Sequence, residues 1–139
     1  MNVFGEVAIK AVKIILNNNS GITIDPQKAW DNAVKEEKES MKKKGCPKET
    51  FLGLCYFGYI KGIKAEVGNH KKLSKNSSYG VEAIKMLCSK DCSPIKRDLW
   101  EKLQSKGAPK NENGQMDVVL ALWNNNFISC GSDFKDNGS

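Results

Sequence analysis

The 139-residue chain has few of the side chains that most often carry catalysis, with one histidine, His70, and one arginine, Arg97. It also lacks a glycine-rich phosphate loop, a serine–histidine–aspartate pattern and a pair of catalytic carboxylates. Aromatic residues make up 8% of the chain, and the longest uninterrupted apolar run, Val118 to Trp123, is far too short to span a bilayer. The sequence therefore contains no recognisable catalytic motif and no membrane-spanning segment.

Cysteine is present five times, an odd number, and the spacing forms no disulfide framework. Glu6, Lys10 and Lys13 interrupt the apolar N-terminus and leave no signal-peptide core, so we expect a soluble cytoplasmic protein with reduced thiols. Cys88 and Cys92 lie four residues apart. Two thiols do not make a zinc site, which needs four compatible ligands. We therefore expect no metal and no cofactor.

Positive charge is concentrated between residues 42 and 75, where nine lysines stand against Glu49 and Glu66. This segment carries +7 in a chain of net charge +6, so the remainder carries −1. Such a pattern is typical of a surface for a polyanion or an acidic partner, and also of a solvated lysine-rich face. The scarcity of arginine disfavours base-specific readout, whereas lysine can still contact phosphates. The candidate polyanion-binding residues are Lys42, Lys43, Lys44, Lys48, Lys61, Lys64, Lys71, Lys72 and Lys75.

The chain also contains a candidate internal repeat. Three similar blocks occur in the same order in both halves, at residues 4–10 and 79–85, 26–30 and 94–100, and 51–60 and 119–128. In the last pair of blocks Gly58 matches Asn126, and both residue types tolerate the left-handed backbone of a helix end. The alternative is that unrelated amphipathic helices look alike. A true duplication would give a two-fold scaffold with an asymmetric surface.

Apolar residues at three- and four-residue spacing predict about six helices. They are expected at residues 3–16, from Pro26 to Val34 with fraying through 35–44, from Cys46-Pro47 to Gly58, from a cap at Ser77 or Ser78, after Ser93-Pro94, and at 115–125. A cap residue followed by proline favours a helix start. No run shows strict alternation of β-branched residues, so only a short extended pairing around residues 59–63 is expected.

The predicted fold is therefore all-α, in one compact domain over residues 1–130. Its repeat units would be two three-helix halves, 3–63 and 77–128, joined by a basic linker at 64–76. Residues 131–139 are expected to form a flexible polar tail.

Two long motifs, GCPKETFLGLC at 45–55 and QMDVVLALW at 115–123, resemble a family of small bacterial proteins of unknown function. The resemblance extends nearly from end to end, from Phe4 to Ile128. It implies no activity, cofactor or substrate, because none is attached to the family.

Cys46 is the candidate catalytic residue. It is expected at the N-cap of the third helix among several lysines, and both features lower the pKa of a thiol. His70 is the one histidine that could act as its base. The alternative is a small residue in a helix start without reactivity. The same start, with Lys48, could bind an anion, and its counterpart in the sixth helix would be Asn113, Gln115 and Asp117.

These patterns leave three functional hypotheses. The first is a non-catalytic binding module whose basic region, residues 42–75, contacts nucleic acid or an acidic protein. The second is a protein-interaction or homo-oligomeric assembly module that pairs apolar helix faces. The third is an enzyme that depends on Cys46. A helix-turn-helix over residues 26–58 fits loosely, because its second helix is too apolar to present side chains to bases.

Overall fold

A computed structural model describes residues 3–18, 24–65 and 74–130 of the chain. These residues form seven α-helices and no strand. The helices are α1 (Val3–Leu16), α2 (Pro26–Val34), α3 (Glu39–Lys42), α4 (Gly45–Tyr56), α5 (Lys75–Cys88), α6 (Lys96–Gln104) and α7 (Gln115–Asn124). The all-α prediction is confirmed, with one more helix than expected. The additional helix is α3, a single turn in the charged run that was expected to fray.

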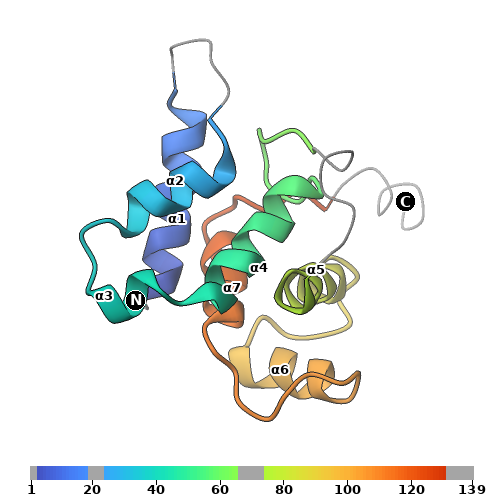
Figure 1. Cartoon of the computed structure of the whole chain (residues 1–139). Helices are drawn as coiled ribbons and strands as arrows, with labels where there is room; N and C mark the ends of the chain where they lie inside the picture. The colour runs from blue at the N-terminus through green and yellow to red at the C-terminus, as the bar shows by residue number, and fades with distance from the viewer. Residues whose placement is uncertain (1–2, 19–23, 66–73, 131–139) are drawn as a thin grey trace.

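Helices α4 and α7 lie at the centre of the molecule, with α1 and α2 on one side of them and α5 and α6 on the other (Figure 1). Helix α4 packs chiefly on α5, and α1 packs on α2 and α7. One cluster of buried apolar side chains receives residues from every helix except the short α3. Among its largest fully buried members are Trp30, Phe51, Leu99 and Met116. The rings of Trp30 and Phe51 join α2 to α4, with their centroids 5.3 Å apart.

Helices α4, α5, α6 and α7 end in the same way. Each is followed by a residue with left-handed backbone, namely Gly58, Lys90, Gly107 and Asn126. After α4 the amide of Tyr59 donates to the carbonyl of Leu54, five residues earlier (2.9 Å). The other three helices end with the same type of hydrogen bond. These bonds satisfy carbonyls that the last helical turn leaves without partners. The predicted helix stops at Gly58 and Asn126 are confirmed.

The helix starts follow the sequence less closely. Ser74 caps α5, because its side chain accepts from the amide of Ser77, and the prediction of Ser77 or Ser78 as the cap is wrong. The hydroxyl of Ser77 instead donates to the carbonyl of Glu49 (2.6 Å) across the α4–α5 contact. The cap-then-proline pattern at Ser93-Pro94 also gave the wrong start for α6, which begins at Lys96. Pro94 lies in a tight turn before the helix, where the amide of Ile95 donates to Ser93 O (2.7 Å).

One short extended pairing joins the two chain halves, as expected near residues 59–63. Ile60 forms an isolated antiparallel bridge with Ile128. The amide of Lys61 donates to Phe127 O, and the amide of Ser129 donates to Tyr59 O, both at 2.8 Å. The segments that follow α4 and α7 are thereby held side by side.

The prediction that every thiol is reduced is wrong for one pair, because Cys88 and Cys130 form a disulfide. The two residues are 42 positions apart in sequence, and their Cα atoms are 5.7 Å apart in the fold. Only the packing of α5 against the segment after α7 brings them together. The sequence carried no signal for this pairing. The remaining cysteines, Cys46, Cys55 and Cys92, are free.

No helix in the described ranges is both long enough and apolar enough to cross a membrane. The tail at 131–139 and most of the predicted linker, residues 66–73, lie outside the described residues.

Candidate functional site

The described lysines of the basic segment lie at the surface. Lys71 and Lys72 fall outside the described residues, as does His70. Two of the others are paired with carboxylates: Lys42 lies 3.2 Å from Glu39, and Lys48 lies 2.9 Å from Asp31. The remaining five are exposed and make no ion pair with any part of the chain that the structure describes. They are Lys43, Lys44, Lys61, Lys64 and Lys75.

These five lysines form two groups rather than one patch. Lys43 and Lys44 precede α4, and Lys75 begins α5, whose next residue contacts the first half of α4. Lys61 and Lys64 follow the other end of α4 (Figure 1). Because α4 has 12 residues, its two ends are about 18 Å apart. These five residues are called the basic surface below.

Cys46 lies in the first turn of α4. The helix begins at Gly45 with Lys44 at its N-cap, so the expected N-cap position of Cys46 is wrong by two residues. None of the described side chains caps this start with a hydrogen bond. Cys46 is half-buried, and its carbonyl accepts a hydrogen bond from the hydroxyl of Thr50 (2.9 Å). The pairing with a histidine base stays a prediction, because His70 lies outside the described ranges.

The free thiols should differ strongly in reactivity. Cys55 is fully buried, and burial, followed by the charge of Asp25, raises the pKa of its thiol well above 9.0. Because the thiolate is the reactive form, we expect iodoacetamide to modify Cys46 and Cys92 in the folded protein at least about tenfold faster than Cys55. Peptide mass spectrometry over a time course measures this directly. If Cys46 reacts no faster than a thiol in an unstructured peptide at pH 7, the enzyme hypothesis fails.

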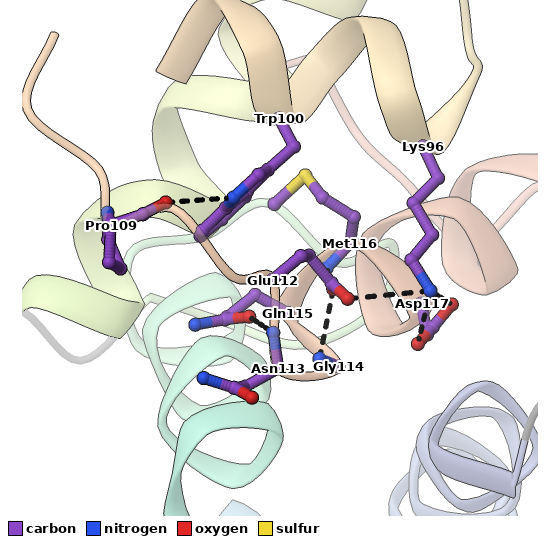
Figure 2. Close-up of polar contacts among 9 residues, drawn as sticks. All are labelled: Lys96, Trp100, Pro109, Glu112, Asn113, Gly114, Gln115, Met116 and Asp117. Atoms are coloured by element: carbon purple, nitrogen blue, oxygen red, sulfur yellow. Dashed lines mark hydrogen bonds and ion pairs between the residues drawn. The ribbon is translucent and has the colours of Figure 1, made fainter. Parts of the chain in front are cut away.

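The start of α7 is occupied by the protein's own carboxylate. Glu112 accepts hydrogen bonds from the amides of Gly114 (2.9 Å) and Met116 (2.8 Å), as Figure 2 shows. Gln115 Oε1 accepts from the amide of Asn113 (2.7 Å). The counterpart position at Asn113, Gln115 and Asp117 is therefore a helix cap, because Glu112 already uses two of the amides that an external anion would need.

Lys96 connects α6 to this start. Its amino group lies 3.4 Å from Glu112 and 3.1 Å from Asp117, whose side chains are 11% and 13% exposed (Figure 2). Burial alone would lower the pKa of Lys96, but the hydrogen bond and charge of Asp117, together with Glu112, outweigh it and raise the pKa above its ordinary value. The cluster therefore keeps Lys96 charged and fixes α6 against α7.

A partly buried set of polar side chains links the starts of α4, α5 and α7. Gln115 is only 1% exposed, and its side-chain Nε2 donates to Asn76 Oδ1 (2.9 Å). Asn76 Nδ2 in turn donates to Glu49 Oε1 (3.2 Å). The fully buried Thr50 lies 3.0 Å from the carbonyl of Asn76. A partly buried network of this kind specifies how three helices meet. The sequence did not reveal it, because its members are far apart in the chain.

A shallow groove of about 700 Å³ runs between α6 and the loop that leads to α7. Trp100 lies in its wall and donates from its indole nitrogen to Pro109 O (3.0 Å), which fixes the loop. Gln104 Nε2 also donates to Pro109 O (3.3 Å) and Lys110 O (3.1 Å). Cationic, anionic and amide groups are mixed along the groove, so its charge favours no single class of ligand.

A family model described as a family of unknown function (DUF6979) matches residues 1–129 of the chain. No curated protein and no solved structure matches. The resemblance to a family of unknown function is thereby confirmed, whereas the bacterial origin and the cytoplasmic location stay predictions.

Proposed function

Because the chain belongs to a family whose function is unknown, we propose from its own residues that it is a non-catalytic binding module for nucleic acid. The contact would run through the basic surface, Lys43, Lys44, Lys61, Lys64 and Lys75. The supporting observation is that these lysines stand exposed at both ends of α4 and are not paired with carboxylates of the described chain.

The spacing of the two groups supports a rod-like partner. A distance of about 18 Å corresponds to about five base pairs of duplex, so one nucleic acid can contact both groups at once. Lysine acts as a flexible point charge, which suits phosphates better than base edges. The proposal is therefore binding to the backbone with little sequence preference.

The positive charge in the second half of the chain is more often compensated. In the second half, Lys85 and Lys106 are paired with Glu82, and Lys96 is paired with Glu112. Exposed pairs add little stability, but they reduce the local positive potential. This asymmetry supports placing the contact on the first half and the segment that follows it.

The assembly hypothesis has less support. Among the described residues, the large apolar side chains that are exposed are Leu16 (40%) and Ile95 (49%). The helix faces that could have paired with another chain are instead packed against one another within this one.

We also infer that the two halves arose by duplication, which would make the basic surface a feature of the first copy and of the linker that follows it. Two observations support this inference. Gly58 and Asn126 occupy matched positions with the same left-handed backbone. The extended pairing is also symmetric between the halves. Lys61 matches Ser129 and Tyr59 matches Phe127, so the hydrogen bond from Lys61 N to Phe127 O corresponds to the one from Ser129 N to Tyr59 O.

The test is fluorescence anisotropy with labelled 20-nucleotide DNA and RNA, single- and double-stranded. We expect affinity to fall by about tenfold or more between 50 and 200 mM salt, because bound lysines release counterions. Lys43→Glu/Lys44→Glu and Lys61→Glu/Lys64→Glu should each weaken binding by at least about tenfold. The matched control, Lys85→Glu/Lys106→Glu, makes the same change in charge and should leave affinity within about threefold.

Absence of binding to every probe at 50 mM salt would contradict the nucleic-acid proposal and leave an acidic protein as the partner for the same lysines. Equal losses in the control variant would show that net charge alone, and not the basic surface, determines the affinity.

A further inference from the structure

The Cys88–Cys130 disulfide joins the end of α5 to the last described residue of the chain. Both cysteines are half-buried rather than enclosed. Disulfides in cytoplasmic proteins are usually transient, catalytic or redox-sensing. For a chain whose sequence predicts a cytoplasmic location, this bond is therefore a candidate for a reversible device.

The segment that the disulfide holds also supports part of the basic surface. Cys130 directly follows Ser129, whose amide donates to Tyr59 O (2.8 Å). Two residues earlier, the carbonyl of Phe127 accepts from the amide of Lys61 (2.8 Å). Lys61 and Lys64 belong to the basic surface, and the pairing that positions Lys61 lies within three residues of the disulfide.

The backbone part of this pairing is short. Among the described residues it is an isolated bridge and not part of a sheet: two backbone hydrogen bonds flank Ile60 and Ile128, whose side chains are buried in the core. Net contributions of single hydrogen bonds are small, so the two hydrogen bonds at the ends of such a bridge open locally without global unfolding. The covalent bond at Cys130 keeps the segment close to its partner and suppresses this opening.

We propose that the Cys88–Cys130 disulfide is a redox clamp that holds residues 127–130 against residues 59–61 and thereby positions Lys61 in the basic surface. Reduction releases the segment and weakens polyanion binding. The proposal extends the nucleic-acid function above, but its structural part stands independently of that function.

The reductant is a dithiol, either a small molecule or a protein dithiol. One of its thiolates attacks a sulfur of the Cys88–Cys130 bond, forms a mixed disulfide and expels the other cysteine as a thiolate. The second thiol of the reductant then closes its own disulfide and releases the remaining cysteine. Two electrons and two protons pass to the protein, which gains two thiols, and the dithiol is oxidised.

The structural test is amide hydrogen exchange by NMR on the full chain, oxidised and then reduced with dithiothreitol. We expect the amides of Lys61 and Ser129 to exchange at least about tenfold faster after reduction. The amide of Phe57, which donates to Gly53 O at the end of α4 (3.0 Å), should not change. Unchanged exchange at Lys61 and Ser129, or an equal acceleration at Phe57, would overturn the clamp.

Two variants make the test specific. Cys130→Ser should exchange rapidly at Lys61 and Ser129 without reductant and should not respond to dithiothreitol. Cys92→Ser removes a free, half-buried cysteine near the same helix end and should respond as the wild type does. A Cys92→Ser protein that has lost the response would assign the exchangeable bond to Cys92 and overturn the proposal.

The same samples are then titrated into the labelled oligonucleotides. We expect the reduced protein to bind about threefold to tenfold more weakly, because Lys61 is less well positioned. Equal affinity in the two states, with accelerated exchange, would overturn the link to the basic surface. If no oligonucleotide binds in either state while exchange responds to reduction, the proposed function has failed and the clamp has not.

Discussion

Gly53→Ala is expected to destabilise the protein by about 2 kcal/mol, although alanine is the better helix former. Gly53 lies in α4 where α5 crosses it. A Cβ atom there would lie 2.5 Å from Ser77 Cβ and 2.9 Å from Ser77 Cα, distances that force the two helices apart. The neighbouring atoms belong to the start of a helix, so they cannot rotate away as the tip of a long side chain could. Chemical denaturation of both proteins measures the difference.

Two further variants separate the crossing from a general effect on α4. Gly45→Ala makes the same change in the same helix, where the nearest atom to a new Cβ is the flexible Glu49 Oε2 at 3.5 Å. It should cost less than about 0.5 kcal/mol. In a double-mutant cycle, Ser77→Gly should recover at least about 1 kcal/mol of the Gly53→Ala loss. A coupling near zero would show that the clash is relieved elsewhere.

This crossing illustrates which parts of the fold the sequence could predict. The spacing of apolar residues predicted α1 over 3–16 and the end of α4 at Gly58, because amphipathic periodicity and a left-handed stop are local properties. The close approach of Gly53 to Ser77 is not local. It depends on how two helices meet, and a glycine in a helical pattern gives no indication of its neighbour.

The same division holds for the candidate site. Charge counting located the lysines, and it could not show that Lys48 is paired with Asp31 or that the free lysines lie at both ends of α4. The disulfide between Cys88 and Cys130 was missed for a similar reason, since 42 residues separate the pair. Contacts between residues so far apart in sequence depend on tertiary packing, and neither composition nor residue spacing predicts them.

The second large effect is expected at the start of α7, where Glu112→Ala should destabilise the protein by about 2 kcal/mol. The change leaves the amides of Gly114 and Met116 without the carboxylate that accepts from them, in a region where the Glu112 side chain is only 11% exposed. Loss of a helix cap typically costs about 1 kcal/mol, and an unsatisfied buried donor adds to it. Glu112→Gln keeps an acceptor oxygen and should lose about half as much.

The pH dependence of the stability loss in Glu112→Ala distinguishes the helix cap from the ion pair between Glu112 and Lys96. The pKa of Lys96 is raised in the fold above its ordinary value of 10.5, so its contacts with Asp117 and Glu112 stabilise the protein fully below that pH and are lost as pH rises through the folded pKa. The difference in the free energy of unfolding between the wild type and Glu112→Ala should therefore become smaller above pH 10.5. A loss of stability due only to the cap would stay constant. Urea denaturation at pH 7 and pH 11 compares the two. Lys96→Met should narrow the difference already at pH 7, because it removes the ion pair and leaves the cap of α7 intact.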